Sequence, residues 1–110
     1  MFLRTTIVSM GLLLIGACQS RPSQEFQSAP EAKLLYERSC SRCHGMHGEG
    51  GPKLGSYTPV RFKDQDVQSR LTDDDIKVAI MNGRPMMPPF KAVLEEKQVT
   101  MLVEYVRGFK

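Results

Sequence analysis

The sequence has too few cysteines for a disulfide-dense scaffold, and it lacks any run of basic residues. It contains three cysteines in 110 residues, and an odd number cannot all pair within one chain. Lysines and arginines alternate with acids, so the formal charge of +3 forms no patch of the kind that binds nucleic acid. With 41% hydrophobic and 25% charged residues, the composition is that of one small globular domain, and nucleic acid is not an expected partner.

The first 17 residues have the pattern of a secretory signal peptide. Arg4 precedes an apolar stretch from Ile7 to Ala17, and the sequence turns polar at Gln19. This stretch is about half of the roughly 20 residues that a membrane-spanning helix needs. The pattern therefore favours a cleaved signal over a permanent transmembrane helix, and it predicts export to the periplasm or the cell surface.

The segment from Leu14 to Cys18 resembles a bacterial lipobox, in which small residues precede a cysteine that becomes lipidated. The resemblance implies that Cys18 anchors the mature protein to a membrane. The alternative is ordinary cleavage near Ala17, which would leave Cys18 as a free thiol in an oxidising compartment. Residues 18–29, rich in Ser and Gln, are predicted to be a flexible linker, followed by a folded domain over residues 30–110.

Three segments have helical patterns, which predicts an all-α domain. A capping box at Ser28–Glu31 precedes an expected helix near Glu31 to Ser41. Thr72 is expected to cap a second helix that ends at Asn82, and an apolar stripe predicts a third near Glu95 to Arg107. No Ser, Thr or Asp marks the start of the third helix.

Cleavage before Cys18 leaves 93 residues, a size at which domains commonly need a non-peptide core element.

Cys40, Cys43 and His44 form the pattern C-x-x-C-H, which is typical of covalent haem attachment. At this spacing two thiols reach neighbouring vinyl groups of the porphyrin, and the adjacent imidazole can coordinate iron. A thioredoxin-like dithiol would need a βαβ context, and no strand pattern surrounds the motif. A structural zinc site would need four ligands, for which His47 is a poor candidate. The motif therefore predicts one covalent haem c.

From about Pro30 to the C-terminus the chain resembles the monohaem class I c-type cytochromes. The matching positions are Leu35, Tyr36 and Arg38 before the motif, Gly48, Gly50, Gly51, Pro52 and Leu54 after it, and Met87-Pro88-Pro89-Phe90 before the last helix. The resemblance implies a small cytochrome c-like fold with crossing N- and C-terminal helices. It also implies that the Pro52 carbonyl accepts a hydrogen bond from the His44 ring and so fixes its tautomer. The residues expected to be buried around the haem are Leu34, Leu35, Val99, Leu102, Tyr105 and Val106.

Methionine is the expected ligand on the opposite face of the iron. Four other side chains are excluded by closeness to His44 or by their helical positions: Met46, His47, Met81 and Met101. Met86 and Met87 remain, in a segment that three prolines make extended and stiff. Met87 is favoured because Pro88 follows it directly and the family's Met-Pro-x-Phe order aligns there, with Met86 as the alternative.

His44 and a methionine would occupy both axial positions, which closes the iron to substrate and favours its ferrous state. The sequence thus predicts a single-electron carrier of a bacterial respiratory or periplasmic redox chain, with redox proteins as donor and acceptor. It does not predict an enzyme, because Asp73 to Asp75 are explained as a helix N-terminus. Two alternatives are a haem enzyme or a gas- or peroxide-responsive protein with a displaceable Met, and a permanent subunit of a larger oxidoreductase.

Charge is distributed unevenly along the chain. Residues 38–63 carry a local charge of +4, and residues 64–75 carry −4. Because the basic stretch contains the C-x-x-C-H motif, and Arg84 and Lys91 flank the two methionines, we expect a positive rim that steers an acidic docking surface. The alternative is that these bases pair with the acidic segment and only solvate the surface.

Overall fold

The computed structural model describes residues 24–110, with side chains from residue 29 onward. The predicted signal peptide and Cys18 lie outside the described residues. Five helices follow one another along the chain: α1 (Gln24–Ser39), α2 (Ser41–His44), α3 (Gln65–Arg70), α4 (Asp73–Asn82) and α5 (Glu96–Arg107). Residues 24–110 contain no strand, which confirms the predicted all-α fold.

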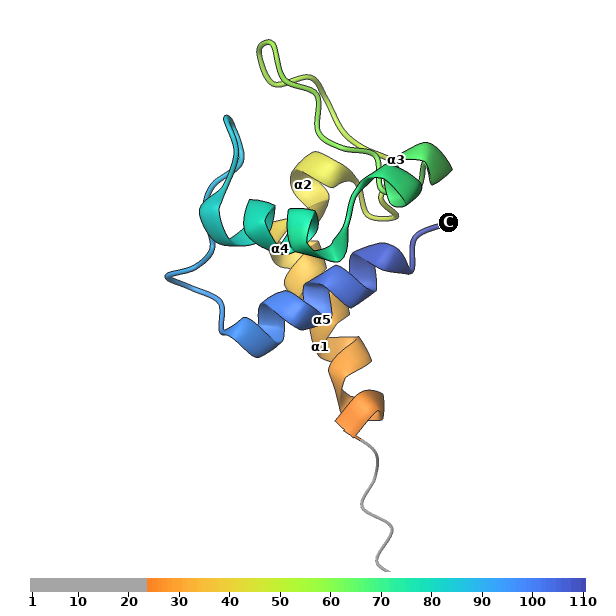
Figure 1. Cartoon of the computed structure of the whole chain (residues 1–110), viewed down its shortest axis with the longest axis vertical. Helices are drawn as coiled ribbons and strands as arrows, with labels where there is room; N and C mark the ends of the chain where they lie inside the picture. Colours follow the sequence, from red (N-terminus) through yellow and green to blue (C-terminus); the bar gives the residue numbers. More distant parts are fainter. Residues whose placement is uncertain (1–23) are drawn as a thin grey trace, which may run out of the picture.

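The core lies where α5 crosses α1 and where α4 packs against α5 (Figure 1). Its buried members are Tyr36, Ile76, Ile80, Val99, Leu102, Val103 and Val106. The expected burial of Val99, Leu102 and Val106 is confirmed, and Leu35 and Tyr105 pack against this core half-buried.

The expected burial of Leu34 is wrong, because 57% of this residue is exposed. Ala32 and Tyr36 lie on the buried face of α1, because residues four apart in a helix lie on the same face. Leu34, two residues from each, therefore lies on the opposite side. The helical period fixes one apolar stripe on α1, and Tyr36 rather than Leu34 belongs to it.

Helix α1 begins at Gln24, which corrects the predicted linker for residues 24–29. Ser28 lies inside the helix, so the expected capping box at this position is wrong. Pro30 is also inside the helix, because its fixed φ is compatible with helical backbone although it donates no hydrogen bond. The start of α1 extends away from the other helices (Figure 1). Within the described residues, every helix is too short or too polar to cross a membrane.

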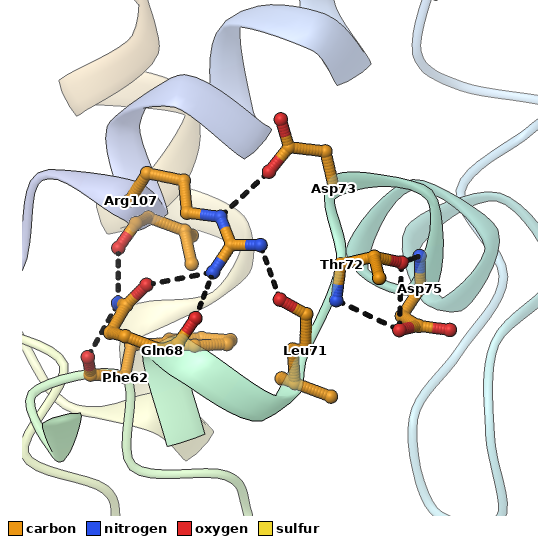
Figure 2. A network of polar contacts seen from close by, with 8 residues as sticks. Phe62, Gln68, Leu71, Thr72, Asp73, Asp75 and Arg107 are labelled. Carbon is orange, nitrogen blue, oxygen red and sulfur yellow. Dashed lines mark hydrogen bonds and ion pairs between the residues drawn. The ribbon is translucent and has the colours of Figure 1, made fainter. Parts of the chain in front are cut away.

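The predicted start and end of α4 are confirmed. The Asp75 backbone N–H donates to Thr72 Oγ1 at 3.1 Å, and the Thr72 backbone N–H donates to Asp75 Oδ2 at 2.8 Å (Figure 2). This reciprocal capping box satisfies two backbone donors that the first turn leaves free. At α5 the Gln98 side chain accepts the Glu95 N–H at 3.0 Å, which supplies a cap where the sequence offered no Ser, Thr or Asp.

Candidate cofactor site

The structure brings Cys40, Cys43, His44 and Met87 to one cavity of about 430 Å³. Cys40 lies in the turn between α1 and α2, Cys43 and His44 belong to α2, and Met87 comes from the segment after α4. The remaining walls are largely apolar: Leu54, Phe62, Ile76, Ile80, Phe90, Leu102 and Val106. The volume and lining are typical of a preformed site for a large, mostly apolar ligand.

The one-turn helix α2 holds the two thiols and the imidazole together. The backbone N–H groups of Cys43 and His44 both donate to the Cys40 carbonyl, at 3.1 and 3.0 Å. Both thiols are free and half-buried, and burial is the main cause that raises the pKa of Cys40 to about 11. Gly51 lies against this turn, and a Cβ at this position would collide with the Cys43 carbonyl oxygen. Only glycine lets the loop pass this close.

The His44 ring is held by a hydrogen bond of 2.9 Å between Nδ1 and the Val60 carbonyl. A carbonyl only accepts, so Nδ1 carries the proton and Nε2 keeps its lone pair free for a metal ion. Burial lowers the pKa of His44, although the bond to Val60 opposes that shift. The imidazole is thus stabilised in its neutral form, in which Nε2 can donate its lone pair to a metal ion.

The expected role of Pro52 as the acceptor for His44 is wrong in this structure. After the exposed Pro52 the chain forms a turn, in which the Leu54 N–H donates to the Tyr57 carbonyl at 2.8 Å, and then returns past His44. Val60 supplies the carbonyl on this return path. Phe62, two residues later, stacks on the imidazole with ring centroids 4.8 Å apart. No short-range sequence signal marks Val60 or Phe62, because their position depends on how this loop folds back.

Residues 84–90, which we name the strap, begin with a tight turn. Arg84 and Met87 exchange two backbone hydrogen bonds of 3.0 and 2.9 Å. Met86 at the turn has φ of 69° and is 60% exposed, whereas Met87 is half-buried against the core. Gly83 precedes the turn at φ of 72°, and a Cβ there would lie 2.5 Å from the Met87 carbonyl oxygen. Both methionines line the cavity, but Met86 is largely exposed whereas Met87 packs against the core.

The side chains that the sequence excluded as ligands do not line the cavity. Met46 is 47% exposed, His47 is exposed, and Met101 is buried at 5% exposure in α5. Met81 packs against the core. Within the described residues, no group of three or more His, Cys, Asp or Glu side chains is arranged so that it could hold a metal ion by itself.

The bases near the cavity have few acidic partners among residues 29–110. Arg61 lies 3.4 Å from Asp64, which is the pairing that the alternative interpretation expected. Asp73 instead binds Arg107 of α5 at 2.7 Å. Arg42, Lys53 and Arg84 are exposed and have no carboxylate within 4.0 Å in the described part of the chain. Most of the basic stretch is thus not neutralised by the acidic segment.

The donor set and cavity fit a covalently held haem. Two thiols stand beside a neutral imidazole with a free Nε2, and a thioether comes from another segment of the same cavity. Apolar walls enclose them, as a porphyrin plane requires.

Comparison with known proteins agrees with this chemistry. Residues 27–106 match the family model described as cytochrome c oxidase, cbb3-type, subunit III. The chain is 27% identical over 105 residues to cytochrome c-551 of Bacillus subtilis (strain 168), covering 86% of this chain and 83% of that protein. It is 34% identical over 88 residues to cytochrome c-554(547) of Halothiobacillus neapolitanus, covering 74% and 97%.

A solved structure shares the fold. The c-type cytochrome KustC0563 superposes with a TM-score of 0.66 at 36% sequence identity, covering 72% of this chain and 96% of that one. The superposed part of this chain is similar in length to the predicted domain over residues 30–110. The family match over residues 27–106 includes the helices and loops that line the cavity.

Proposed function

The chain belongs to the cytochrome c family, and from this premise we propose that it is a single-electron carrier with one haem c bound through Cys40 and Cys43. Small c-type cytochromes bind haem covalently and carry electrons. The observation that carries the proposal is the shared cavity of the C-x-x-C-H motif and Met87.

His44 and Met87 are the proposed axial ligands. The Val60 carbonyl holds the proton on His44 Nδ1 and leaves Nε2 to bind the metal. Met87 closes a turn through two backbone hydrogen bonds with Arg84, and its side chain packs on the core, which restricts the position of its thioether. When bound, haem iron supplies a centre that gains or loses one electron. The apolar walls exclude water from it and thereby limit reorganisation of solvent.

A fixed Met87 also supports electron transfer over the alternative, in which the methionine leaves to admit peroxide or a gas. The stiff prolines and the Arg84–Met87 turn restrict the strap. Displacement of Met87 would break its packing against the core as well as its bond to the metal. We therefore favour closed coordination at both axial positions.

Denaturing extraction into acidified organic solvent tests covalent attachment. We expect the haem to stay with the wild-type chain, and Cys40→Ala or Cys43→Ala to impair attachment because each removes one thioether. His44→Ala should abolish the low-spin spectrum. A redox titration of the wild-type protein should show one single-electron wave per chain. Haem released from the wild-type chain, or more than one wave, would contradict the proposal.

We also propose that the protein is exported and held to a membrane by a lipid on Cys18. The support is the lipobox-like segment before Cys18, which lies outside the described residues. Several acyl chains give stable anchoring, whereas one chain binds reversibly. Cys18→Ser should move the haem domain from the membrane fraction to the soluble exported fraction, with Ser20→Ala as the matched control. Wild-type protein found wholly in the soluble exported fraction would contradict this.

The proposed partners are redox proteins with an acidic docking surface. Support comes from the three exposed bases without carboxylate partners, Arg42, Lys53 and Arg84, which belong to the motif and the two loops that flank the cavity. Opposite charge on a partner would raise the rate of encounter.

A further inference from the structure

A network of polar contacts joins Gln68 and Arg107 to the carbonyl of Phe62 and to the start of α4 (Figure 2). Gln68 of α3 donates from Nε2 to the Phe62 carbonyl at 2.6 Å and to the Val106 carbonyl at 2.9 Å. Its Oε1 accepts from Arg107 Nη1 at 3.1 Å. The Gln68 amide therefore uses both its donor and its acceptor atoms, which fixes its orientation.

Arg107 of α5 is itself held from several sides. Its Nε binds Asp73 Oδ1 at 2.7 Å, its Nη1 donates to the Gln68 carbonyl at 2.7 Å, and its Nη2 donates to the Leu71 carbonyl. The guanidinium is mostly buried, with 26% of the side chain exposed. A planar fork of this kind holds partners in a fixed geometry. Arg107 thus joins the ends of α3 and α5 and the start of α4, and it orients the Gln68 amide.

The anchored carbonyl belongs to Phe62, whose ring stacks on the His44 imidazole. Two residues before it, the Val60 carbonyl accepts the His44 Nδ1 proton. Phe62 therefore lies in a short segment that contacts His44 both at the ring face and at Nδ1. One further anchor of this segment is the Lys63 N–H, which donates to the Gly48 carbonyl at 2.9 Å.

We propose that Gln68, oriented by Arg107, is a positioning residue for His44: it fixes the segment 60–62 and thereby the hydrogen bond from His44 Nδ1 to Val60. The inference rests on the proposed function, in which His44 is the axial ligand. A hydrogen bond at Nδ1 raises the basicity of a metal-bound imidazole. Loss of the Gln68 anchor should weaken that bond, make the ligand less basic and destabilise the ferric state.

Two variants of the holoprotein separate positioning from packing. Gln68→Met keeps the length of the side chain but removes all hydrogen bonds of the side-chain amide. Gln68→Glu keeps an acceptor for Arg107 but loses the donor to Phe62. Thr72→Ala is the matched control, because it weakens the neighbouring helix cap without touching segment 60–62. The measurements are hydrogen exchange of the His44 Nδ1 proton by NMR in the reduced protein, and the reduction potential.

We expect exchange at least tenfold faster in both Gln68 variants than in the wild type and in Thr72→Ala. The reduction equilibrium should shift at least threefold toward the ferrous form, which corresponds to a rise of about 28 mV for one electron. If both Gln68 variants have the same His44 Nδ1 exchange rate and the same reduction potential as Thr72→Ala, the inference about Gln68 is wrong, while the proposed function stands. Ferric wild-type protein without hyperfine-shifted His44 signals would overturn the proposed function and the inference together.

Discussion

At the scale of single residues, Met86 and Met87 show how one turn separates two chemically identical side chains. The sequence favours Met87 as the axial ligand and keeps Met86 as the alternative. Met86 takes the left-handed position of the turn and is 60% exposed, while Met87 packs on the core. The register follows from the two hydrogen bonds between Arg84 and Met87, which close the turn at a fixed residue.

Met87→Ala should therefore eliminate the weak near-infrared band of thioether coordination to ferric iron. The potential should fall by on the order of 0.1 V, because the thioether favours the ferrous state and axial ligands tune haem potentials over about 0.8 V. Met86→Ala is the matched control and should leave both nearly unchanged. Loss of the band in Met86→Ala with its retention in Met87→Ala would reverse the assignment.

Tyr36 is a second residue whose role is local. It is fully buried, and its hydroxyl donates to the Gly45 carbonyl at 2.8 Å, one residue after His44. Tyr36→Phe should lower the free energy of unfolding by about 0.5–1.5 kcal/mol, because the carbonyl loses its partner while the ring packing stays. Denaturant unfolding measures this, with Tyr57→Phe at an exposed position as control. Equal stability of Tyr36→Phe and the wild type would refute the assigned contribution.

Residues that act through their immediate neighbours were predictable from the sequence, and those that act through a folded loop were not. Cys40, Cys43 and His44 lie within five positions, so one helical turn brings them together. The hydrogen-bond acceptor for His44 depends on how residues 53–59 fold back toward the ring, and the family resemblance implied Pro52 where the structure has Val60. Gln68 and Arg107, 39 positions apart, carry no pattern that would pair them.

At the scale of elements, the capping box of α4 couples helix stability to pH. Hydrogen bonds from the Thr72 backbone and hydroxyl hold the pKa of Asp75 below its usual range. A carboxyl whose pKa is lowered by folding stabilises the protein at pH values above its unfolded pKa of about 3.9. This contribution is lost as the pH falls through the lower folded pKa.

Asp75→Asn should thus destabilise the protein near neutral pH, and the difference from the wild type should shrink as the pH falls below about 4. Asp74→Asn, in the same turn but outside the capping box, is the control. Thr72→Ala should cost about 1 kcal/mol of unfolding free energy. The measurement is denaturant unfolding from pH 7 to pH 3. A difference between Asp75→Asn and the wild type that is the same at every pH would contradict this coupling.

Helices with clear end signals were predicted well, and those without them were not. Thr72 and Gly83 bound α4 as expected, because cap and stop residues act locally. Helix α3 has only six residues, too short for a periodic pattern, and its carbonyl end is held by Arg107 from α5. The sequence predicted a later start of α1 because Ser28 to Glu31 match a capping box, whereas in the structure these residues lie inside the helix.

At the scale of the whole molecule, the charges beside the cavity should steer partner encounter. The rate of electron transfer with an acidic partner should fall as ionic strength rises, because the screening length shortens to about 8 Å at physiological salt. Arg42→Glu or Arg84→Glu should slow the reaction by roughly tenfold at low salt. Lys33→Glu on α1, which does not line the cavity, makes the same charge change as control. A rate that stays flat or rises with salt would exclude this docking surface.

The central claim is that both axial positions are closed and that the protein carries electrons. The most direct test is the absorption spectrum of the ferric wild-type holoprotein before and after cyanide is added. With His44 and Met87 both bound, the spectrum should be low-spin and six-coordinate, and it should not change on mixing. A high-spin spectrum, or immediate formation of a cyanide complex, would contradict the claim and favour a protein with an open or displaceable position.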